Sequence, residues 1–139
     1  MISLICGSIV SMYKLKQILP RWLPALVMMS VIFLFSSQPS EKLPDLGRAD
    51  HLFKKGGHML GYGLLALSYW NGFGWDRRKR PIAWLSAVLY AATDEFHQSF
   101  VAGRSPSIWD VLVFDNLGAL IALWLAGLFL KQKRPDENA

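Results

Sequence analysis

The sequence predicts an all-α membrane protein, a bundle of four transmembrane helices with both termini in the cytoplasm. Three observations support this fold class. The composition is 53% hydrophobic. The apolar residues form four blocks that approach the ~20 consecutive residues needed to cross a bilayer as a helix. The basic residues stand at the edges of these blocks, where they mark topology. With 139 residues, the chain suffices for one such domain and not for two.

Four segments are predicted to span the membrane, and polar or helix-breaking residues bound each of them. They cover about residues 22–37, 57–73, 81–101 and 108–130. Pro20 and Pro24 are expected in or near the first turns of the first span, where a missing amide donor costs least. The chain is therefore divided into an N-terminal cytoplasmic segment (1–21), a transmembrane domain (22–130) and a disordered cytoplasmic tail (131–139).

The first eleven residues are apolar but too short to span a membrane. They have neither the basic start nor the small-residue cleavage site of a signal peptide. Met12, followed by a run with two lysines, is typical of the start of a membrane protein. We therefore expect residues 1–11 to be dispensable, so that a chain beginning at Met12 inserts normally.

The distribution of Lys and Arg predicts the orientation. With four spans, both termini and the loop after the second span share one side of the membrane. The basic residues on that side are Lys14, Lys16, Arg21, Arg77, Arg78, Lys79, Arg80, Lys131, Lys133 and Arg134. Those on the other side are Lys42, Arg48, Lys54, Lys55 and Arg104. Ten of the 15 thus fall on the side of the termini, which predicts that this side is cytoplasmic.

The charge distribution argues against a nucleic-acid partner, and the cysteine content excludes internal disulfides and cysteine-based zinc sites. The net charge of +5 does not indicate a nucleic-acid partner, because no basic patch interleaved with aromatic residues lies outside the spans. Cys6 is the only cysteine, which excludes an internal disulfide and a cysteine-based zinc site. No cofactor is expected.

Polar and ionisable residues gather in the outer halves of the last three spans. They are Asp50, His51, Lys55, His58, Tyr62, Asp94, Glu95, His97, Gln98, Arg104, Asp110, Asp115 and Asn116. At ~1.5 Å per residue, Asp94 and Asp115 each lie roughly 10 Å inside the outer helix ends. An ionised group at mid-bilayer costs about 2.5–3.5 kcal/mol, so any one of these residues could simply pair with another and pin the helices together. Their shared depth favours a functional pocket at the outer leaflet.

Helical periodicity predicts how that pocket is built. The face of the second span with His58 and Tyr62 is expected to meet the face of the third span with Asp94 and Gln98, and Arg104 would close the pocket from above. His58 and Asp94 would then lie at most one water apart. Glu95 and Asp115 would border the same cavity, and His97 would lie nearer its rim.

Small residues are expected where helices approach closely. Gly57 and Gly61 would provide such a face on the second span, and Gly118, Ala122 and Ala126 on the fourth. On a regular helix Asp110 and Asp115 are about 140° apart, so both can face one pocket only if the helix starts late or contains an irregular turn.

These residues resemble motifs of the VanZ-like family of small bacterial membrane proteins. The matching pieces are Ser36-Ser37-Gln38, Lys55-x-x-His58-x-x-x-Tyr62 with Leu64-Leu65, Asp94-Glu95-x-x-Gln98 with Phe100, Gly103-Arg104, Asp110-Val111-Leu112 and Asp115-x-x-Gly118-Ala119. Their order and spacing cover residues 33–125. In the family, the second polar residue of the last span follows the first by four positions, whereas Asp115 follows Asp110 by five.

The resemblance implies a multi-pass protein of the bacterial cytoplasmic membrane, and the family's namesake is linked to resistance to the glycopeptide teicoplanin. We expect the site to act on a cell-envelope amphiphile, either a lipid-linked precursor or a lipoglycopeptide. The expected catalytic residues are His58, Asp94 and Glu95. The expected substrate-binding residues are Lys55, Tyr62, Gln98, Arg104, Asp110 and Asp115. Whether a reaction is catalysed stays open at this point.

Two other functions and one other site chemistry are compatible with the sequence. A proton-coupled transporter would use the buried carboxylates and would need a homo-oligomer to enclose a path. A non-catalytic structural or regulatory protein would use the polar cluster only to fix helix packing. A metal bound by His58, His97, Asp94 and Glu95 is a further option, but no strict ligand motif is present, and we predict no metal site.

Overall fold

The computed structural model describes residues 2–39, 41 and 50–132, with side chains described within 19–39, 41 and 55–130. The elements in chain order are α1 (Ile2–Ser36), α2 (Asp50–Gly72), the 3-10 helix η3 (Arg77–Lys79), α3 (Arg80–Gln98), the π-helix η4 (Asp110–Asp115) and α4 (Asn116–Gln132). The all-α fold with four α-helices is thus confirmed. The expected disordered tail falls largely on 133–139, outside the described residues.

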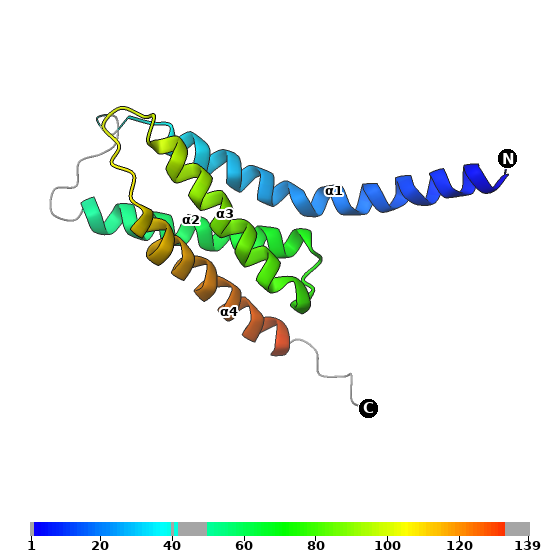
Figure 1. Ribbon diagram of the computed structural model, residues 1–139. Helices are drawn as coiled ribbons and strands as arrows, with labels where there is room; N and C mark the ends of the chain where they lie inside the picture. The colour runs from blue at the N-terminus through cyan, green and yellow to red at the C-terminus, as the bar shows by residue number, and fades with distance from the viewer. Residues whose placement is uncertain (1, 40, 42–49, 133–139) are drawn as a thin grey trace.

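Helix α1 begins at Ile2 and not near Trp22, so Pro20 and Pro24 lie inside it and not in its first turns. An interior proline costs about 3 kcal/mol, because one carbonyl loses its amide donor. The residues on both sides are mostly good helix formers such as Leu, Met, Lys and Gln, which help to offset this cost. Figure 1 shows that the N-terminal half of α1 extends beyond the other three helices.

The four helices run alternately in opposite directions. The N-terminal end of α1, the end of α4 and the turn that holds η3 lie at one end of the bundle (Figure 1). The last turn of α1, the start of α2, the end of α3 and η4 lie toward the other end. Helix α2 contacts α1, α3, η4 and α4. It is therefore the helix that packs on all the other elements of the polar end of the bundle.

The closest helix contact joins α2 to α4 through glycine. A Cβ atom on Gly118 would lie only 2.1 Å from the carbonyl oxygen of Met59 in α2, and one on Gly63 would lie 3.0 Å from the carbonyl oxygen of Gly118 and 3.2 Å from Cβ of Ala122. The small-residue face of the fourth helix is therefore confirmed at Gly118 and Ala122.

The expected role of Gly57 and Gly61 in helix packing is wrong. A Cβ atom at Gly57 would meet nothing within 4 Å, and one at Gly61 would touch only the side chain of Ile32, at 3.9 Å. Both glycines lie on a side of α2 where the neighbouring helix stands back, because the close approach uses Gly63, which points about 200° around the helix from Gly61. Instead of joining two helices, they line a cavity.

The interior of the bundle changes in character along its length. Ala83, Ala87 and Ala91 form the buried face of α3, and the same face continues into the buried Asp94 and Gln98. Opposite the alanines, α2 buries large side chains, namely Leu65, Tyr69 and Trp70. The small side chains of α3 make room for these large ones. The apolar interior therefore gives way to a polar one toward the end of α3.

Large apolar side chains are exposed on all four α-helices. Leu34, Leu60, Leu89 and Phe129 are examples, one from each of α1 to α4. Water-soluble monomers rarely expose extended apolar patches, whereas a bilayer favours them. Two segments, Leu19–Ser36 and Asp110–Leu130, are long and apolar enough to cross a membrane. The predicted multi-span character is thus supported by two helices of the described part of the chain.

Candidate functional site

Several of the polar residues that the sequence singles out come together where α2 meets the end of α1, the end of α3 and η4. Figure 1 shows these segments toward one end of the bundle. Helix α2 supplies His58 and Tyr62, α3 supplies Asp94 and Gln98, and η4 supplies Asp115. Each of them contacts a residue of this group or of the neighbouring α1. The expected convergence of separate segments is therefore present, at one end of the bundle.

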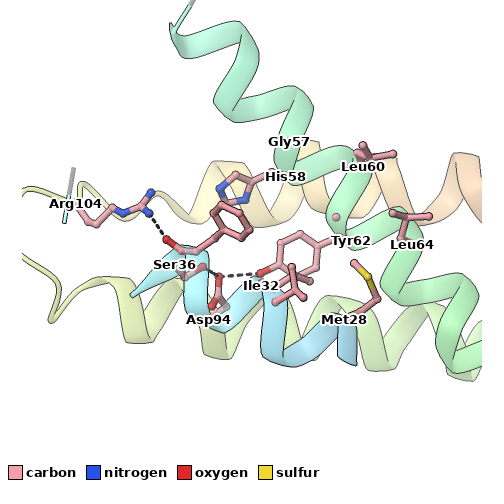
Figure 2. Close-up of a pocket in the computed structure, with 13 residues that line it drawn as sticks. Met28, Ile32, Ser36, Gly57, His58, Leu60, Tyr62, Leu64, Asp94 and Arg104 are labelled. Atoms are coloured by element: carbon pink, nitrogen blue, oxygen red, sulfur yellow. Dashed lines mark hydrogen bonds between the residues drawn. The ribbon is translucent and has the colours of Figure 1, made fainter. Parts of the chain in front are cut away.

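Asp94 is the centre of the first hydrogen-bond group. Its side chain is only 3% exposed. The hydroxyl of Ser36 donates to Oδ2 at 2.6 Å, the hydroxyl of Tyr62 at 3.0 Å, and the amide Nε2 of Gln98 at 3.0 Å. Figure 2 shows Ser36 and Tyr62 reaching Asp94 from opposite sides. All three donors are neutral, and all three bind the same oxygen, so Oδ1 is left without a partner in the described structure.

His58 and Asp115 form the second group. Nδ1 of His58 lies 3.1 Å from Oδ1 of Asp115, whose side chain is 1% exposed, whereas that of His58 is 25% exposed. The hydrogen-bond partner of His58 is therefore Asp115, while the expected closeness of His58 and Asp94, at most one water apart, stays a prediction. Asp94 accepts from Ser36, Tyr62 and Gln98, and η4 carries Asp115 next to α2.

The π-helix η4 explains how both aspartates of the fourth span face α2. In a π-helix the hydrogen bonds run from residue i to i+5, so one extra residue fits into a turn. Asp110 lies 3.7 Å from the ammonium of Lys55, and Lys55 precedes His58, the partner of Asp115, by about one turn of α2. Lys55 also lies 4.2 Å above the ring of Phe114. The irregular turn that a shared face requires is therefore present, and it accommodates the five-residue spacing.

Arg104 holds the end of α1. Its Nε donates to the carbonyl of Gln38 at 3.0 Å, and its Nη2 donates to the carbonyl of Phe35 at 2.6 Å. The last carbonyls of a helix lack intrahelical donors and carry partial negative charge, so a guanidinium here is favourable on both counts. Arg104 also lines the cavity described below, at the polar end where it was expected.

Glu95 and His97 do not line the cavity. Glu95 is half-buried and accepts a short hydrogen bond from the backbone amide of Ser107, which fixes the loop before η4. Nε2 of His97 lies 3.1 Å from the hydroxyl of Ser37, and its ring stacks on Phe33 with centroids 4.5 Å apart. The predicted place of Glu95 at the cavity is therefore wrong, because its neighbour Asp94 takes the inward face of α3. Both residues are half-buried beside the polar cluster, Glu95 against the loop before η4 and His97 against the end of α1.

A cavity of about 380 Å³ lies between α1 and α2. It is lined by Met28, Val31, Ile32, Phe35, Ser36, Gly57, His58, Leu60, Gly61, Tyr62, Leu64, Asp94 and Arg104. Figure 2 shows its two ends: Met28, Leu60 and Leu64 at one, Arg104 and Asp94 toward the other. Several apolar lining residues, such as Leu60 and Phe35, are also exposed on the surface of the bundle. The cavity is thus an apolar groove with one polar end.

The wall contributed by α1 was missed by sequence reasoning, which placed the pocket between the second and third spans. Met28, Ile32, Phe35 and Ser36 recur at helical spacing and form this wall. An apolar stripe on an apolar helix carries no distinguishing signal, because lipid-facing and cavity-facing residues look alike. Ser36 was visible only as part of a family motif. Helix α3 contributes Asp94 alone to the lining.

The arrangement has a definite chemical capacity. A carboxylate at Nδ1 of a histidine fixes the orientation of the ring, so that the other ring nitrogen can accept a proton from a group in the cavity. The apolar part of the groove can hold a hydrocarbon chain. Within the described part of the chain, no group of three or more His, Cys, Asp or Glu side chains is placed to hold a metal ion.

Comparison with known proteins bears on the whole of this domain. The family model described as VanZ/LLP1 matches residues 21–130, a range that includes every residue lining the cavity and the four segments predicted as spans. This match confirms the family that the sequence motifs resemble. No match was found among curated proteins or among solved structures.

Proposed function

The chain belongs to the VanZ/LLP1 family, and on this basis we propose that it binds a cell-envelope amphiphile at the outer face of the bacterial cytoplasmic membrane. In this proposal all four α-helices span the membrane, both termini are cytoplasmic, and the polar end of the bundle lies at the outer leaflet. The ligand class is a lipid-linked precursor or a lipoglycopeptide, and glycopeptide resistance would be one consequence of binding it.

The observation that carries the proposal is the shape and polarity of the groove between α1 and α2. One end is bounded by Met28, Leu60 and Leu64, and the other by Ser36 and Asp94. An amphiphile has the same division into a hydrocarbon chain and a polar head. Ligand sites are mostly apolar cavities of about 300–1,000 Å³ with a few polar groups, and this groove, at about 380 Å³, fits that description.

The polar groups at α2 and α3 also support the assignment of these two helices as spans. The mean hydropathy of α2 and α3 is lowered by the polar residues at this end of the bundle, such as His58 in α2 and Asp94 and Glu95 in α3. Ionisable residues within membrane spans are rare, face the interior of a bundle and mark functional sites. Asp94 and Asp115 are buried and hydrogen-bonded, as this rule requires.

A transporter fits the described structure less well. A transported solute needs polar groups along the whole path, but here the buried polar residues Ser36, Asp94, Gln98 and Asp115 lie at one end of the bundle. The opposite half of the interior is built from Ala83, Ala87, Leu65 and Trp70. A binding or catalytic site open to the outer leaflet needs polar groups at that end only.

The proposal is tested by filling the groove. Gly57 lines the groove and a Cβ atom there meets nothing within 4 Å, so the side chain of Gly57→Leu can begin without a clash and fill part of the groove. The full-length protein, extracted from bacterial membranes in mild detergent, is analysed by native mass spectrometry for bound amphiphiles. We expect Gly57→Leu to reduce their occupancy at least about tenfold, equivalent to ~1.4 kcal/mol of binding free energy.

Gly56 provides the matched control. It is the preceding residue of α2, a Cβ atom there also meets nothing within 4 Å, and it does not line the groove. Gly56→Leu should keep the occupancy of the wild type. Equal occupancy in Gly57→Leu, Gly56→Leu and wild type would show that the amphiphile does not bind in this groove.

A further inference from the structure

The carboxylate of Asp94 has hydrogen bonds but no cation. Its three partners, the side chains of Ser36, Tyr62 and Gln98, are neutral, and all bind Oδ2. The second oxygen, Oδ1, is buried and has no hydrogen-bond partner among the described residues. Asp94 also lines the groove. A buried, unpaired acceptor at the wall of a cavity is costly unless a ligand satisfies it.

The basic groups near this end of the bundle are already engaged. Lys55 pairs with Asp110, His58 lies against Asp115, and Arg104 donates two of its N–H groups to carbonyls at the end of α1. Within the described part of the chain, none of them lies within ion-pair distance of Asp94. Among the side chains that the structure describes, none therefore supplies the positive charge that would balance Asp94.

Asp115 differs from Asp94 although it too has an oxygen without a partner, Oδ2. Its other oxygen lies against His58, a residue that can carry positive charge, and Asp115 is not among the residues that line the groove. Of the two buried aspartates in the described part of the chain, only Asp94 both lines the groove and lacks a partner that can carry positive charge.

We propose that the amphiphile carries a primary ammonium group in its head, which donates a hydrogen bond to Oδ1 of Asp94. This inference rests on the proposed function, since it assumes that the groove holds the chain of the ligand. An ammonium supplies both things that Oδ1 lacks, a hydrogen-bond donor and a positive charge. A hydroxyl supplies only the donor, a quaternary ammonium supplies only the charge, and a phosphate would repel the carboxylate.

Arg104 extends the same scheme to the rest of the head group. A guanidinium has five N–H donors, and the two hydrogen bonds to Phe35 and Gln38 leave others for an anion. Arg104 and Asp94 both line the polar end of the groove (Figure 2). A zwitterionic head can place its ammonium at Asp94 and its phosphate or carboxylate at Arg104.

The test compares lysophospholipids that share one palmitoyl chain and a phosphate and differ only beyond it. Lysophosphatidylethanolamine has a primary ammonium, lysophosphatidylcholine a quaternary one, and lysophosphatidylglycerol hydroxyls. Their binding to the full-length protein in mild detergent is measured by native mass spectrometry with all three in competition. We expect the ethanolamine lipid to bind at least about tenfold more tightly than either of the others.

Two variants separate the head group from the chain. Asp94→Asn, which keeps the size of the side chain and removes its charge, should abolish the preference while all three lipids still bind. Gly57→Leu should weaken all three lipids equally. If Asp94→Asn does not fold, the ranking of the three lipids in the wild type decides the question by itself.

The outcomes are distinguishable. If the wild type bound the choline or glycerol lipid equally or more tightly, the proposed primary ammonium in the head group would be wrong. Binding of the chain in the groove would still stand. Binding unaffected by Gly57→Leu would overturn the groove as the site, and with it the proposed function and this inference. No binding of any of the three would overturn this inference alone, because the proposed function is judged by the copurified amphiphiles. O-phosphoethanolamine, which has the head but no chain, serves as the last probe. If O-phosphoethanolamine bound as tightly as the ethanolamine lipid, the ligand would be a soluble amine, and the proposal of an amphiphile would be wrong.

Discussion

At the scale of single residues, the buried carboxylates define what the site can accept. Asp94 and Asp115 each have one oxygen that is hydrogen-bonded and one that is not. In the low dielectric of a membrane interior, an unsatisfied acceptor costs more than it would near water. A protein that needed these residues only to fix helix packing would gain by satisfying both oxygens of each. The unpaired oxygen of Asp94, which lines the groove, therefore favours a site that a ligand completes.

Gly118 is the residue where the packing of α2 on α4 is least tolerant of change. Gly118→Ala would place a Cβ atom 2.1 Å from the Met59 carbonyl oxygen and 2.7 Å from its carbonyl carbon, both of them backbone atoms that cannot rotate away. Overpacking of this kind costs about 1–3 kcal/mol, more than the ~0.5–1 kcal/mol that alanine gains over glycine in a helix. We expect a clearly lower thermal unfolding midpoint in detergent.

Gly56→Ala is the matched control for helix propensity, because a Cβ atom at Gly56 has no neighbour within 4 Å. It should keep or slightly raise the unfolding midpoint, by the gain of alanine over glycine alone. If Gly118→Ala behaved like Gly56→Ala, the close contact between the backbones of α2 and α4 would be wrong.

At the scale of elements, η4 sets the geometry of the whole polar end. It spans Asp110–Asp115 and lets Asp110 meet Lys55 while Asp115 meets His58. On a regular helix, residues four apart share a face, whereas residues five apart do not. The π-turn therefore compensates for one residue more than the four-residue spacing of the family motif.

Removing one residue from η4 should therefore be tolerated. Deletion of Val113, which is exposed, leaves the two aspartates four residues apart, so that a regular α-helix can present both to α2. We expect the variant to accumulate in the membrane and to lose less than about 1 kcal/mol of stability. Thermal unfolding in detergent measures this directly.

Deletion of Leu120 is the control, because this residue is equally exposed but lies in the regular part of α4. There the deletion rotates the following residues by ~100°, which moves the buried Leu123 off the interior face. This variant should not accumulate as folded protein. A loss of folded protein in both deletions would show that η4 does not absorb an extra residue.

The elements also show which features of the fold can be predicted from the sequence. The third helix, predicted over 81–101, is observed as Arg80–Gln98, because proline at its start and polar residues at its end are strong local signals. The partner of His58 was missed, because periodicity tells which residues share a face but not which neighbour that face meets. The turn in η4 depends on contacts with α2 that local sequence does not encode.

At the scale of the whole molecule, one end of the bundle differs from the other. The turn between α2 and α3 is rich in arginine: Arg77 donates to the carbonyl of Gly127 at 3.3 Å, and Arg80 donates to that of Leu123 at 2.7 Å. The polar end of the groove lies toward the opposite end of the bundle. If the arginine-rich end is cytoplasmic, as the positive-inside rule predicts, the cavity faces the outer leaflet.

Reporter fusions test this orientation. Fusions after Lys79 and after Lys133 should be active with a cytoplasmic reporter, and fusions after Asp45 and after Arg104 with an exported one. The physical reason is the retention of Lys and Arg near span ends on the cytoplasmic side. The fusion after Lys79 is the most informative of the four, because the turn it probes carries a run of four basic residues, Arg77 to Arg80.

Activity of an exported reporter after Lys79 would place the arginine-rich turn outside and the polar end of the groove at the inner leaflet. The groove and its ammonium-binding carboxylate could then still bind an amphiphile, but only one present in the cytoplasmic leaflet, and an antibiotic arriving from outside would be excluded. Cytoplasmic activity after both Lys79 and Arg104 would show instead that α3 does not cross the membrane. The four fusions thus decide both the number of spans and the leaflet from which the groove between α1 and α2 is filled.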